Sequence, residues 1–335
     1  MTKGGFFMTL AGFRKLRFAI LKFGVGTGLA LAGMSVWPVP CQQTGGNVWA
    51  ANPIKQQIQW EHLGKHLALP ALNARVDRVW RAIPGLNGWQ LNAPLSQQAT
   101  AQAQDGAIHL VWDKISPTVS LSKLPREPIY RGPDAERSAS LMFNVSWGEA
   151  YIPDILRILR QTGVKATFFV DGRWVEKYPN LVKDIAQSGH AIGSHGSGHP
   201  DFRRLQDGQL RKQIVDTNQV ILRVSGVNPI LLAPPAGSFD GRTVRQATSA
   251  GMYTILWSVD SIDWRHPPAE QIMQRIEKQV HPGAFILLHP TASTVQALPG
   301  IIRTLQDKGY HLKTITQVVL EQRAVAPPER LSALS

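Results

Sequence analysis

The sequence predicts an α/β fold: a distorted or incomplete (β/α) barrel of about seven strands, with a small N-terminal α+β module. From residue 139 onward, an amphipathic stretch that ends in glycine precedes a short apolar run, and this happens five times. Glycine is favoured just after a helix, because a left-handed backbone is easily adopted only without a Cβ atom. Helices that alternate with buried strands build a parallel sheet. The glycines are Gly163, Gly189, Gly226, Gly251 and Gly309.

Each predicted strand is the apolar run that follows one of these glycines, and two further strands complete the set. An opening strand lies near Leu141, and another apolar run occupies 285–288. In barrels of this kind the chemistry lies at the carboxyl ends of the strands, on one rim. The strands that follow the glycines are expected at 164–170, 191–194, 230–233, 253–259 and 310–315.

The chain before the barrel has a different pattern, typical of a small module followed by a linker. A helix is predicted over 72–80 and a strand over 106–112, and four prolines between 117 and 133 indicate a linker. The module either binds a glycan or covers the main domain. We therefore divide the chain into a leader or anchor at 1–50, the module and linker at 51–137, the barrel at 138–320 and a tail at 321–335.

The first 50 residues have the three-part layout of a secretory signal. They contain five basic and no acidic side chains, then an apolar stretch at 23–37, then Val48 and Ala50 at the −3 and −1 positions of a cleavage site. Export to the cell envelope is predicted. The alternatives are an uncleaved anchor or a buried helix, although the apolar stretch is shorter than the ~20 residues of a spanning helix. Membrane contact is expected only through this segment.

The composition excludes several classes of protein. Cys41 is the only cysteine, so neither an internal disulfide nor a multi-cysteine metal site can form. The formal net charge of +13 favours an anionic partner such as nucleic acid, anionic lipid or an acidic wall polymer. Because the chain has neither zinc-finger spacing nor a phosphate-binding loop, we expect no nucleic-acid partner.

Two histidines follow the predicted strand at 191–194 and are spaced for one metal ion. His195 and His199 lie four residues apart in a glycine-rich loop at the predicted rim. His62 and His66 have the same spacing in an ordinary amphipathic stretch, so context rather than spacing separates the two pairs. We predict metal ligands at His195 and His199; the alternative is a polar loop with hydrogen-bonded histidines.

A third histidine, His289, ends the apolar strand at 285–288. A buried histidine commonly does no more than find a hydrogen-bond partner, which is the structural alternative. The functional interpretation is a general acid held by a carboxylate, for which Asp263 and Asp260 are the candidates. Trp264 is then expected to wall the pocket, because aromatic faces suit sugar rings.

The order of these motifs resembles the NodB-homology domain of polysaccharide deacetylases, a group that includes carbohydrate esterase family 4. The resemblance runs from residue 138 to about residue 314, more than half of the chain. Residues 144–149 with 233–235 resemble, more narrowly, the sporulation-associated branch of endospore-forming bacteria. The matching segments are HGSGHP at 195–200, APPAG at 233–237, Asp263-Trp264, Leu288-His289 and KATFF at 165–169.

This resemblance implies a metal-dependent hydrolase that acts on N-acetyl groups of a cell-wall or spore-envelope polysaccharide. In the family, one Asp and two His hold a divalent metal, for which we expect Zn²⁺, and the metal polarises the acetamide carbonyl. A second Asp, steadied by an Arg, is the base, and a His paired with an Asp protonates the leaving amine. The carried-over residues are His195 and His199 for the metal, His289 and Asp263 for the acid, and Trp264 and Pro235 for substrate.

Three family positions depart from the pattern. The base position is Asn144, whose amide can orient water but cannot take its proton. The metal carboxylate position is Val145, and the position of the tethering arginine is Ala233. Losing the base together with its tether indicates a changed site. Glu149 is the nearest carboxylate that is a candidate to replace the base, and Asp171, at the end of the next strand, is another.

Three functional hypotheses follow from this combination. The first is a polysaccharide deacetylase with an atypical site and a reduced rate, which the retained histidines favour. The second is a catalytically weakened or inactive deacetylase-like protein that binds envelope glycan, which Asn144, Val145 and Ala233 favour. The third is a barrel that acts on another amide or ester.

Overall fold

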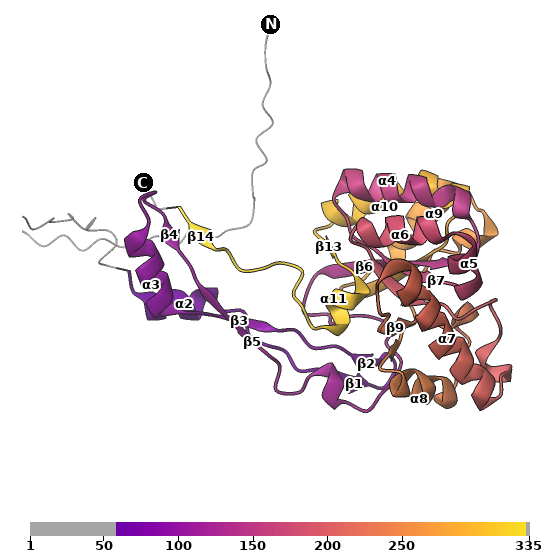
Figure 1. Cartoon of the computed structure of the whole chain (residues 1–335). Helices are drawn as coiled ribbons and strands as arrows, with labels where there is room; N and C mark the ends of the chain where they lie inside the picture. Colours follow the sequence, from indigo (N-terminus) through magenta and orange to yellow (C-terminus); the bar gives the residue numbers. More distant parts are fainter. Residues whose placement is uncertain (1–57, 333–335) are drawn as a thin grey trace, which may run out of the picture. The chain divides into compact units, whose positions relative to one another are not determined.

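The computed structural model describes residues 58–332, so the predicted leader lies outside the described residues. Its main element is a parallel sheet with the strand order β10-β9-β8-β7-β6-β12-β11, and β13 adds to the start of β6 (Figure 1). The expectation of a curled barrel of about seven strands is confirmed. The strands are β6 (Ser138–Val145), β7 (Thr167–Val170), β8 (Ala191–Ser194), β9 (Leu231–Leu232), β10 (Tyr253–Thr254), β11 (Val259–Asp260), β12 (Ala284–Leu288) and β13 (His311–Leu312).

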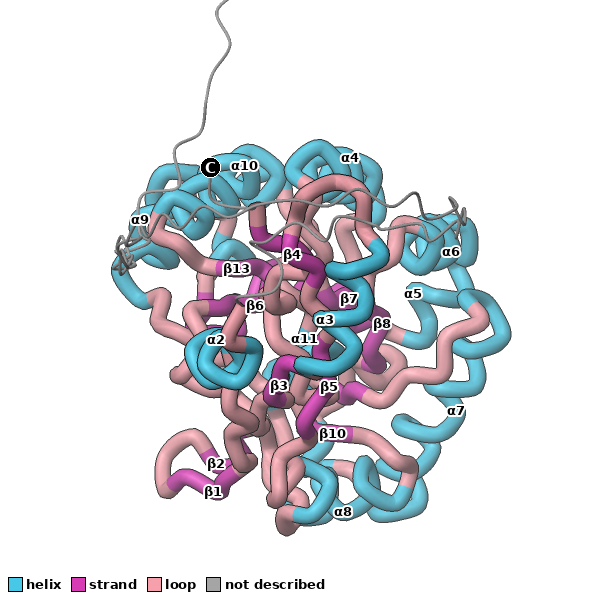
Figure 2. Tube along the Cα trace, turned by 90° about the vertical axis from the view of Figure 1, so that its left-hand side faces the viewer, coloured by secondary structure: helices cyan, strands magenta, loops and turns pink. Residues whose placement is uncertain are grey.

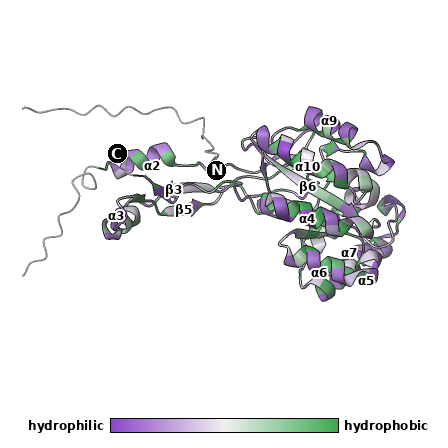
Figure 3. Cartoon of the chain, turned by 90° about the horizontal axis from the view of Figure 1, so that it is seen from above, coloured by the Kyte–Doolittle hydropathy of each residue, from purple (hydrophilic) through white to green (hydrophobic). Residues whose placement is uncertain are grey.

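Helices surround this sheet on the outside (Figure 2). Most of them combine apolar and polar residues, so one face of each packs inward and the other meets solvent (Figure 3). No helix within residues 58–332 has the length and apolarity that a membrane span requires. The helices are α4 (Ile152–Thr162), α5 (Gly172–Lys177), α6 (Pro179–Gln187), α7 (Asp207–Ser225), α8 (Gly241–Ser249), α9 (Ala269–Gln279), α10 (Ala292–Asp307) and α11 (Ile315–Val319).

Strand β6 runs through the middle of the sheet and is buried along its whole length. Its side chains alternate, as in any strand. Leu141, Phe143 and Val145 belong to the apolar cluster beneath the outer helices, whereas Met142 belongs to the cluster inside the curled sheet. Residue 144 lies with Met142 on the inner face of the sheet. Its polar side chain lies near the carboxyl end of β6, where the rim begins.

The single strand predicted over 253–259 is wrong. Residues 253–254 form β10 at one edge of the sheet, and residues 259–260 form β11 at the other edge. The residues between them connect the two edges of the sheet: Ile255 N–H donates to Leu232 O in β9, and Ser258 N–H donates to Phe285 O in β12. One apolar run therefore serves two strands, a distinction that hydrophobic pattern cannot make because every residue in it is buried or half-buried.

The N-terminal module is built from short elements, and the helix predicted over 72–80 is wrong. That segment is a hairpin of β1 and β2, because the Asp77 carboxylate accepts the N–H groups of Val79 and Trp80 at 2.8 Å and so forms a turn. The strand predicted over 106–112 is two strands, β4 and β5. The elements are α2 (Trp60–Leu67), β1 (Arg75–Asp77), β2 (Arg81–Ile83), β3 (Gly88–Leu91), α3 (Ala93–Gln102), β4 (Ile108–His109), β5 (Trp112–Ile115) and β14 (Arg330–Leu331).

Residues 321–332, which the sequence suggested as a tail, pair with this module. Strand β14 pairs with β4, and the Trp112 indole donates to Pro328 O at 2.8 Å. The Glu321 carboxylate is buried and accepts the N–H groups of Gly85 and Leu121 at 3.1 and 2.7 Å. The C-terminal segment is thus joined to the module and the linker by one strand pairing and by hydrogen bonds between side chains and backbone groups.

Substitution Glu321→Ala is expected to lower the free energy of unfolding by about 2–4 kcal/mol, because two buried N–H donors lose their acceptor. Glu321→Gln retains an amide oxygen and should lose markedly less. Urea denaturation of the two variants measures the difference. A Glu321→Ala variant within about 0.5 kcal/mol of wild type would show that this buried contact does not stabilise the fold.

His190 makes stability depend on pH. Its Nδ1 accepts the N–H of Ala166 at 3.2 Å, and burial lowers the pKa of His190 from 6.5 to about 4. Since the unfolded chain binds the extra proton first, stability is fully present above pH 6.5 and declines as the pH falls towards 4, by up to ~1.4 kcal/mol per pH unit. His190→Asn keeps an acceptor but does not titrate, so its stability should decline less over this range. Equal pH dependence in urea unfolding of both proteins would contradict this role.

Candidate active site on the barrel rim

The rim carries an intact histidine–carboxylate pair. His289 follows β12, and its Nδ1 lies 2.8 Å from Oδ1 of Asp263, which is fully buried. A carboxylate can only accept, so Nδ1 carries the hydrogen and Nε2 is left for another partner. The second oxygen of Asp263 accepts the backbone N–H of His289 and the hydroxyl of Thr294, each at 2.6 Å. Between the two candidate carboxylates of the sequence, the structure therefore selects Asp263 over Asp260.

Two residues of this arrangement were missed from sequence. Thr294 is buried in the first turn of α10 and fixes the Asp263 carboxylate. Trp147 is 41% exposed, and its ring is parallel to the His289 ring with centroids 6.1 Å apart. The signal for Trp147 was available, because it lies two residues beyond the strand that ends at Val145. Thr294 gave no signal, since a threonine near a helix N-terminus is ordinary.

The two predicted metal histidines come together. The rings of His195 and His199 have centroids 5.3 Å apart at an angle of 64°. His195 is buried, and its Nδ1 lies 2.7 Å from Ala233 O, which orients the ring and leaves Nε2 available. Burial, with help from His199, lowers the pKa of His195 to about 3, so this imidazole stays neutral, as a metal ligand must.

These donors fit a two-histidine cation site but not the three-ligand site of a resident metal. Within residues 58–332, no three His, Cys, Asp or Glu side chains converge where they could hold one ion. Val145 is fully buried among apolar residues beneath the helices and offers no donor atom in its side chain. The anionic ligand that the resemblance implies is therefore missing, and we assign no catalytic step to a metal.

The base side of the site is equally incomplete. Asn144 is 4% exposed, and its Oδ1 has no hydrogen-bond partner. Ala233 is fully buried, and its small side chain cannot tether a carboxylate. An unpartnered buried amide oxygen is costly unless a ligand or water satisfies it, so this atom is available to a bound substrate group.

Neither nearby carboxylate is free to replace the missing base. Asp171 is buried: Oδ1 caps α5, and Oδ2 accepts the N–H groups of Gly198 and His199 at 2.6 and 3.2 Å. Its role is to hold the loop that carries His199. The Glu149 carboxylate accepts the hydroxyl of Tyr178 at 2.7 Å, and this hydrogen bond lowers the pKa of Glu149. A lowered pKa makes Glu149 a weaker base still.

The rim loops hold an unusual share of strained backbone. Six non-glycine residues among those described have positive φ, and four of them lie at this rim: His199, Ala236, Ile262 and His266. Such residues cost roughly 1–3 kcal/mol each and persist only where the surrounding structure enforces them. Ile262 is the most unfavourable, since it is β-branched, and it directly precedes Asp263. The fold thus maintains this geometry at a cost to stability.

His199 lines two cavities, and we call them together the rim groove. One, of about 430 Å³, is lined by Pro235 among others; the second, of about 480 Å³, is lined by Trp147. Pro235 and His199 line the first cavity together, and a role of Pro235 in substrate binding stays a prediction. Trp264 is 44% exposed, with the Arg265 guanidinium 4.7 Å above its ring.

Known proteins are similar to this chain in both sequence and fold. The family model described as "Polysaccharide deacetylase" matches residues 131–255. The uncharacterized protein YlxY of Bacillus subtilis is 40% identical over 254 residues, 75% of this chain and 79% of that protein. A peptidoglycan-N-acetylglucosamine deacetylase of Bacillus cereus is 35% identical over 191 residues, 56% of this chain and 70% of that protein.

Among solved structures, wild-type BA3943 of Bacillus anthracis, described as a CE4 family pseudoenzyme, has a TM-score of 0.70 and 36% identity, covering 79% of this chain and 96% of that one. A mutant of BA3943 described as having restored enzymatic activity has a TM-score of 0.70 and 35% identity, covering 79% and 99%. The rim motifs, the curled parallel sheet and these relatives agree, and the chain belongs to the polysaccharide deacetylase family.

Proposed function

We propose that this protein binds an N-acetylated polysaccharide of the cell envelope in the rim groove, and that it removes acetyl groups far more slowly than a complete site would. The proposal rests on a site in which the acid is retained and the base is missing. The acid pair His289–Asp263 is intact at 2.8 Å, whereas the base position holds the amide of Asn144. An amide orients a water molecule but does not accept its proton.

The retained residues have roles that suit sugar binding and proton donation. His289 would donate a proton from Nε2 to the leaving amine, while Asp263 stabilises the positive ring. Trp147 and Trp264 are 41% and 44% exposed at the rim, and aromatic side chains favour sugar rings. The unpartnered Oδ1 of Asn144 would accept the N–H of an acetamide group. The groove can therefore hold an N-acetyl sugar without a working base.

His195 and His199 would be the protein ligands of a divalent cation, with Zn²⁺ as the expected ion. When bound, such an ion polarises an acetamide carbonyl. With two neutral ligands, binding should be weaker than at a three-ligand site. His195→Ala or His199→Ala should abolish the rim ion in a zinc titration, whereas His62→Ala, in the exposed pair on α2, should leave it unchanged. Equal zinc content at the rim in all three variants would refute the assignment.

The polymer is proposed to be peptidoglycan or a related spore-envelope glycan, outside the cytoplasm. The relatives named as peptidoglycan deacetylases support this choice. The leader at 1–50 supports export, with a mature start near Ala51. Cell fractionation and N-terminal sequencing check this; a cytoplasmic protein that begins at Met1 would contradict it.

A second candidate function is glycan binding with no turnover at all. It is favoured by the combined absence of a base, an anionic metal ligand and a tether at Asn144, Val145 and Ala233, and by the likeness to a pseudoenzyme. Both candidates use the same groove and differ only in rate.

The test combines binding with acetate release. Wild-type protein is titrated with a chitin-type oligosaccharide, and acetate is measured over the same period with this oligosaccharide and with peptidoglycan. The proposal expects saturable binding and slow acetate release. Binding without any release selects the second candidate. Failure to bind either polymer would overturn both.

A further inference from the structure

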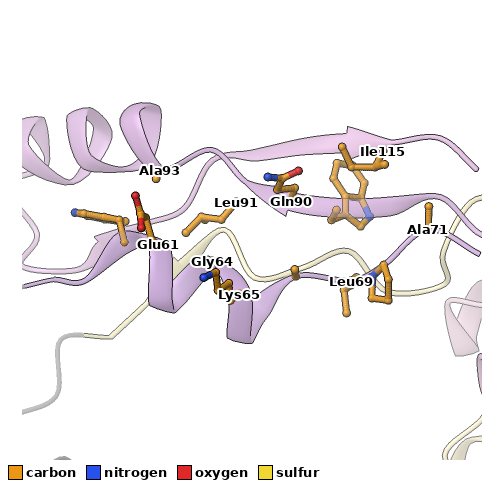
Figure 4. Close-up of a pocket in the computed structure, with 13 residues that line it drawn as sticks. Glu61, Gly64, Lys65, Leu69, Ala71, Gln90, Leu91, Ala93 and Ile115 are labelled. Atoms are coloured by element: carbon orange, nitrogen blue, oxygen red, sulfur yellow. The ribbon is translucent and has the colours of Figure 1, made fainter.

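The N-terminal module contains a cavity of its own, which we call the module cavity. It has a volume of about 680 Å³ and lies between helix α2 and the strand pair β3–β5 (Figure 4). This volume is within the roughly 300–1,000 Å³ of ligand pockets. The residues that decide its chemistry are Trp60, Glu61 and Lys65 of α2, Trp89 and Gln90 of β3, and Ile115 of β5.

The apolar part of the lining is aromatic. Trp60 and Trp89 come from different elements, and both are half-buried, so part of each indole is available from the cavity. Neither indole N–H has a hydrogen-bond partner within the described chain. By contrast, the Trp112 indole on the neighbouring strand donates to Pro328 O at 2.8 Å. Within residues 58–332, the two lining tryptophans thus keep both a flat apolar face and an indole N–H donor without a partner.

The polar part of the lining is also uncommitted. The side chains of Glu61, Lys65 and Gln90 are exposed, and no hydrogen bond or ion pair engages them anywhere in residues 58–332. They lie around the cavity together with the apolar side chains (Figure 4). One acid and one base cancel, so the lining is close to neutral and does not select a strongly charged ligand.

We propose that the module cavity is a second glycan-binding site, which takes an uncharged N-acetylated sugar segment. Indole faces pack on the apolar faces of sugar rings, while carboxylate, ammonium and amide groups pair with hydroxyl and acetamide groups. Neutrality of the lining argues against nucleic acid and anionic lipid. Only the identity of the sugar rests on the proposed function of the rim groove.

Tethering two glycan sites on one chain has a quantitative consequence for a polymer. Once one site is occupied, the second binds at an effective concentration set by the tether, so polymer affinity can exceed that of either site by about 10²- to 10⁴-fold. An oligosaccharide too short to occupy both sites at once gains nothing from the tether. A slow or inactive rim groove would in this way still give firm attachment to the wall.

The experiment uses the protein without its leader and an N-acetylglucosamine tetramer, with calorimetry to count sites and sedimentation to measure retention on peptidoglycan. Wild type is expected to bind two tetramers. Trp89→Ala should bind only one tetramer. Its affinity for peptidoglycan should exceed its affinity for the tetramer by about tenfold or less. Gln90→Ala, which is exposed and leaves the fold intact, should weaken the same site. Gln98→Ala, an exposed glutamine on α3 outside the cavity, is the matched control.

The rim variant Trp147→Ala/Trp264→Ala separates this inference from the proposed function. If it loses one site while Gln90→Ala weakens the other, both stand. If wild type binds one tetramer, and that binding is lost in the rim variant but unchanged by Gln90→Ala, the module site alone is overturned. If wild type binds one tetramer and only the module variants weaken that binding, the module site stands and the rim proposal is overturned. Concentration-dependent dimers that disappear in Trp89→Ala, without tetramer binding, would mean that the cavity holds a second copy, and would also overturn the inference.

Discussion

The triple variant Asn144→Asp/Val145→Asp/Ala233→Arg is expected to release acetate about 10²- to 10⁴-fold faster than wild type, since this is the usual contribution of one general base. It places a carboxylate at the base position, a carboxylate at the family's metal-ligand position and an arginine at the tether position, while His289, Asp263 and the two rim histidines are already in place. Acetate release at fixed zinc concentration is the measurement.

Asn144→Asp alone is the control and should help little, because the new anion lacks its arginine. Val145 and Ala233 are fully buried, so the two added charges will lower stability, and folding must be checked by circular dichroism. A triple variant that folds and binds zinc but stays inactive would show that divergence extends beyond these three positions. A single variant as fast as the triple would show that the tether and the metal carboxylate are unimportant.

Asp263→Asn in the triple variant is expected to reduce the acetate-release rate by about 10²- to 10⁴-fold. The backbone N–H of His289 and the Thr294 hydroxyl both donate to Oδ2 of Asp263, so the asparagine oxygen must remain there. The NH₂ group then faces Nδ1 of His289, which forces the hydrogen of the neutral ring onto Nε2 and disfavours the doubly protonated acid. Nitrogen NMR of the ring reports this change even in the wild-type background.

Asp260→Asn is the matched control for that experiment. Asp260 lies only three residues earlier, but its carboxylate accepts the N–H of Ile262 and does not contact His289. Its substitution should leave both the ring hydrogen and the rate nearly unchanged. Equal losses in the two variants would indicate a general effect of charge at the rim, and would remove Asp263 from its assigned position.

Sequence alone predicted the parts of this fold that repeat. Glycine after a helix and an apolar run after the glycine are local features, so β7 and β8 were located within a few residues. The rule that parallel strands end on one rim then placed His289 and Asp263 together, on the same rim as the loop that carries His195 and His199. His289 and Asp263 are 26 residues apart in the sequence, yet topology determines their proximity.

The failures have a common physical cause, which is competition from side-chain and tertiary hydrogen bonds. The Asp77 carboxylate turned a helical pattern into a hairpin, and the crossing at Ile255 and Ser258 split one apolar run into two strands. Periodicity cannot register either effect. Asp171 was likewise considered as a base, although its oxygens are fully engaged with backbone N–H groups that only the folded loop supplies.

The central claim, that the rim groove holds an N-acetyl sugar it hardly hydrolyses, is tested most directly by the ligand itself. Wild-type protein is incubated with an N-acetylglucosamine tetramer, its crystal structure is determined, and the recovered sugar is weighed by mass spectrometry. We predict an intact N-acetyl group between Trp147 and Asn144, and a sugar that retains its acetyl groups while the triple variant removes them. A tetramer deacetylated by wild type as fast as by the triple variant would contradict the account.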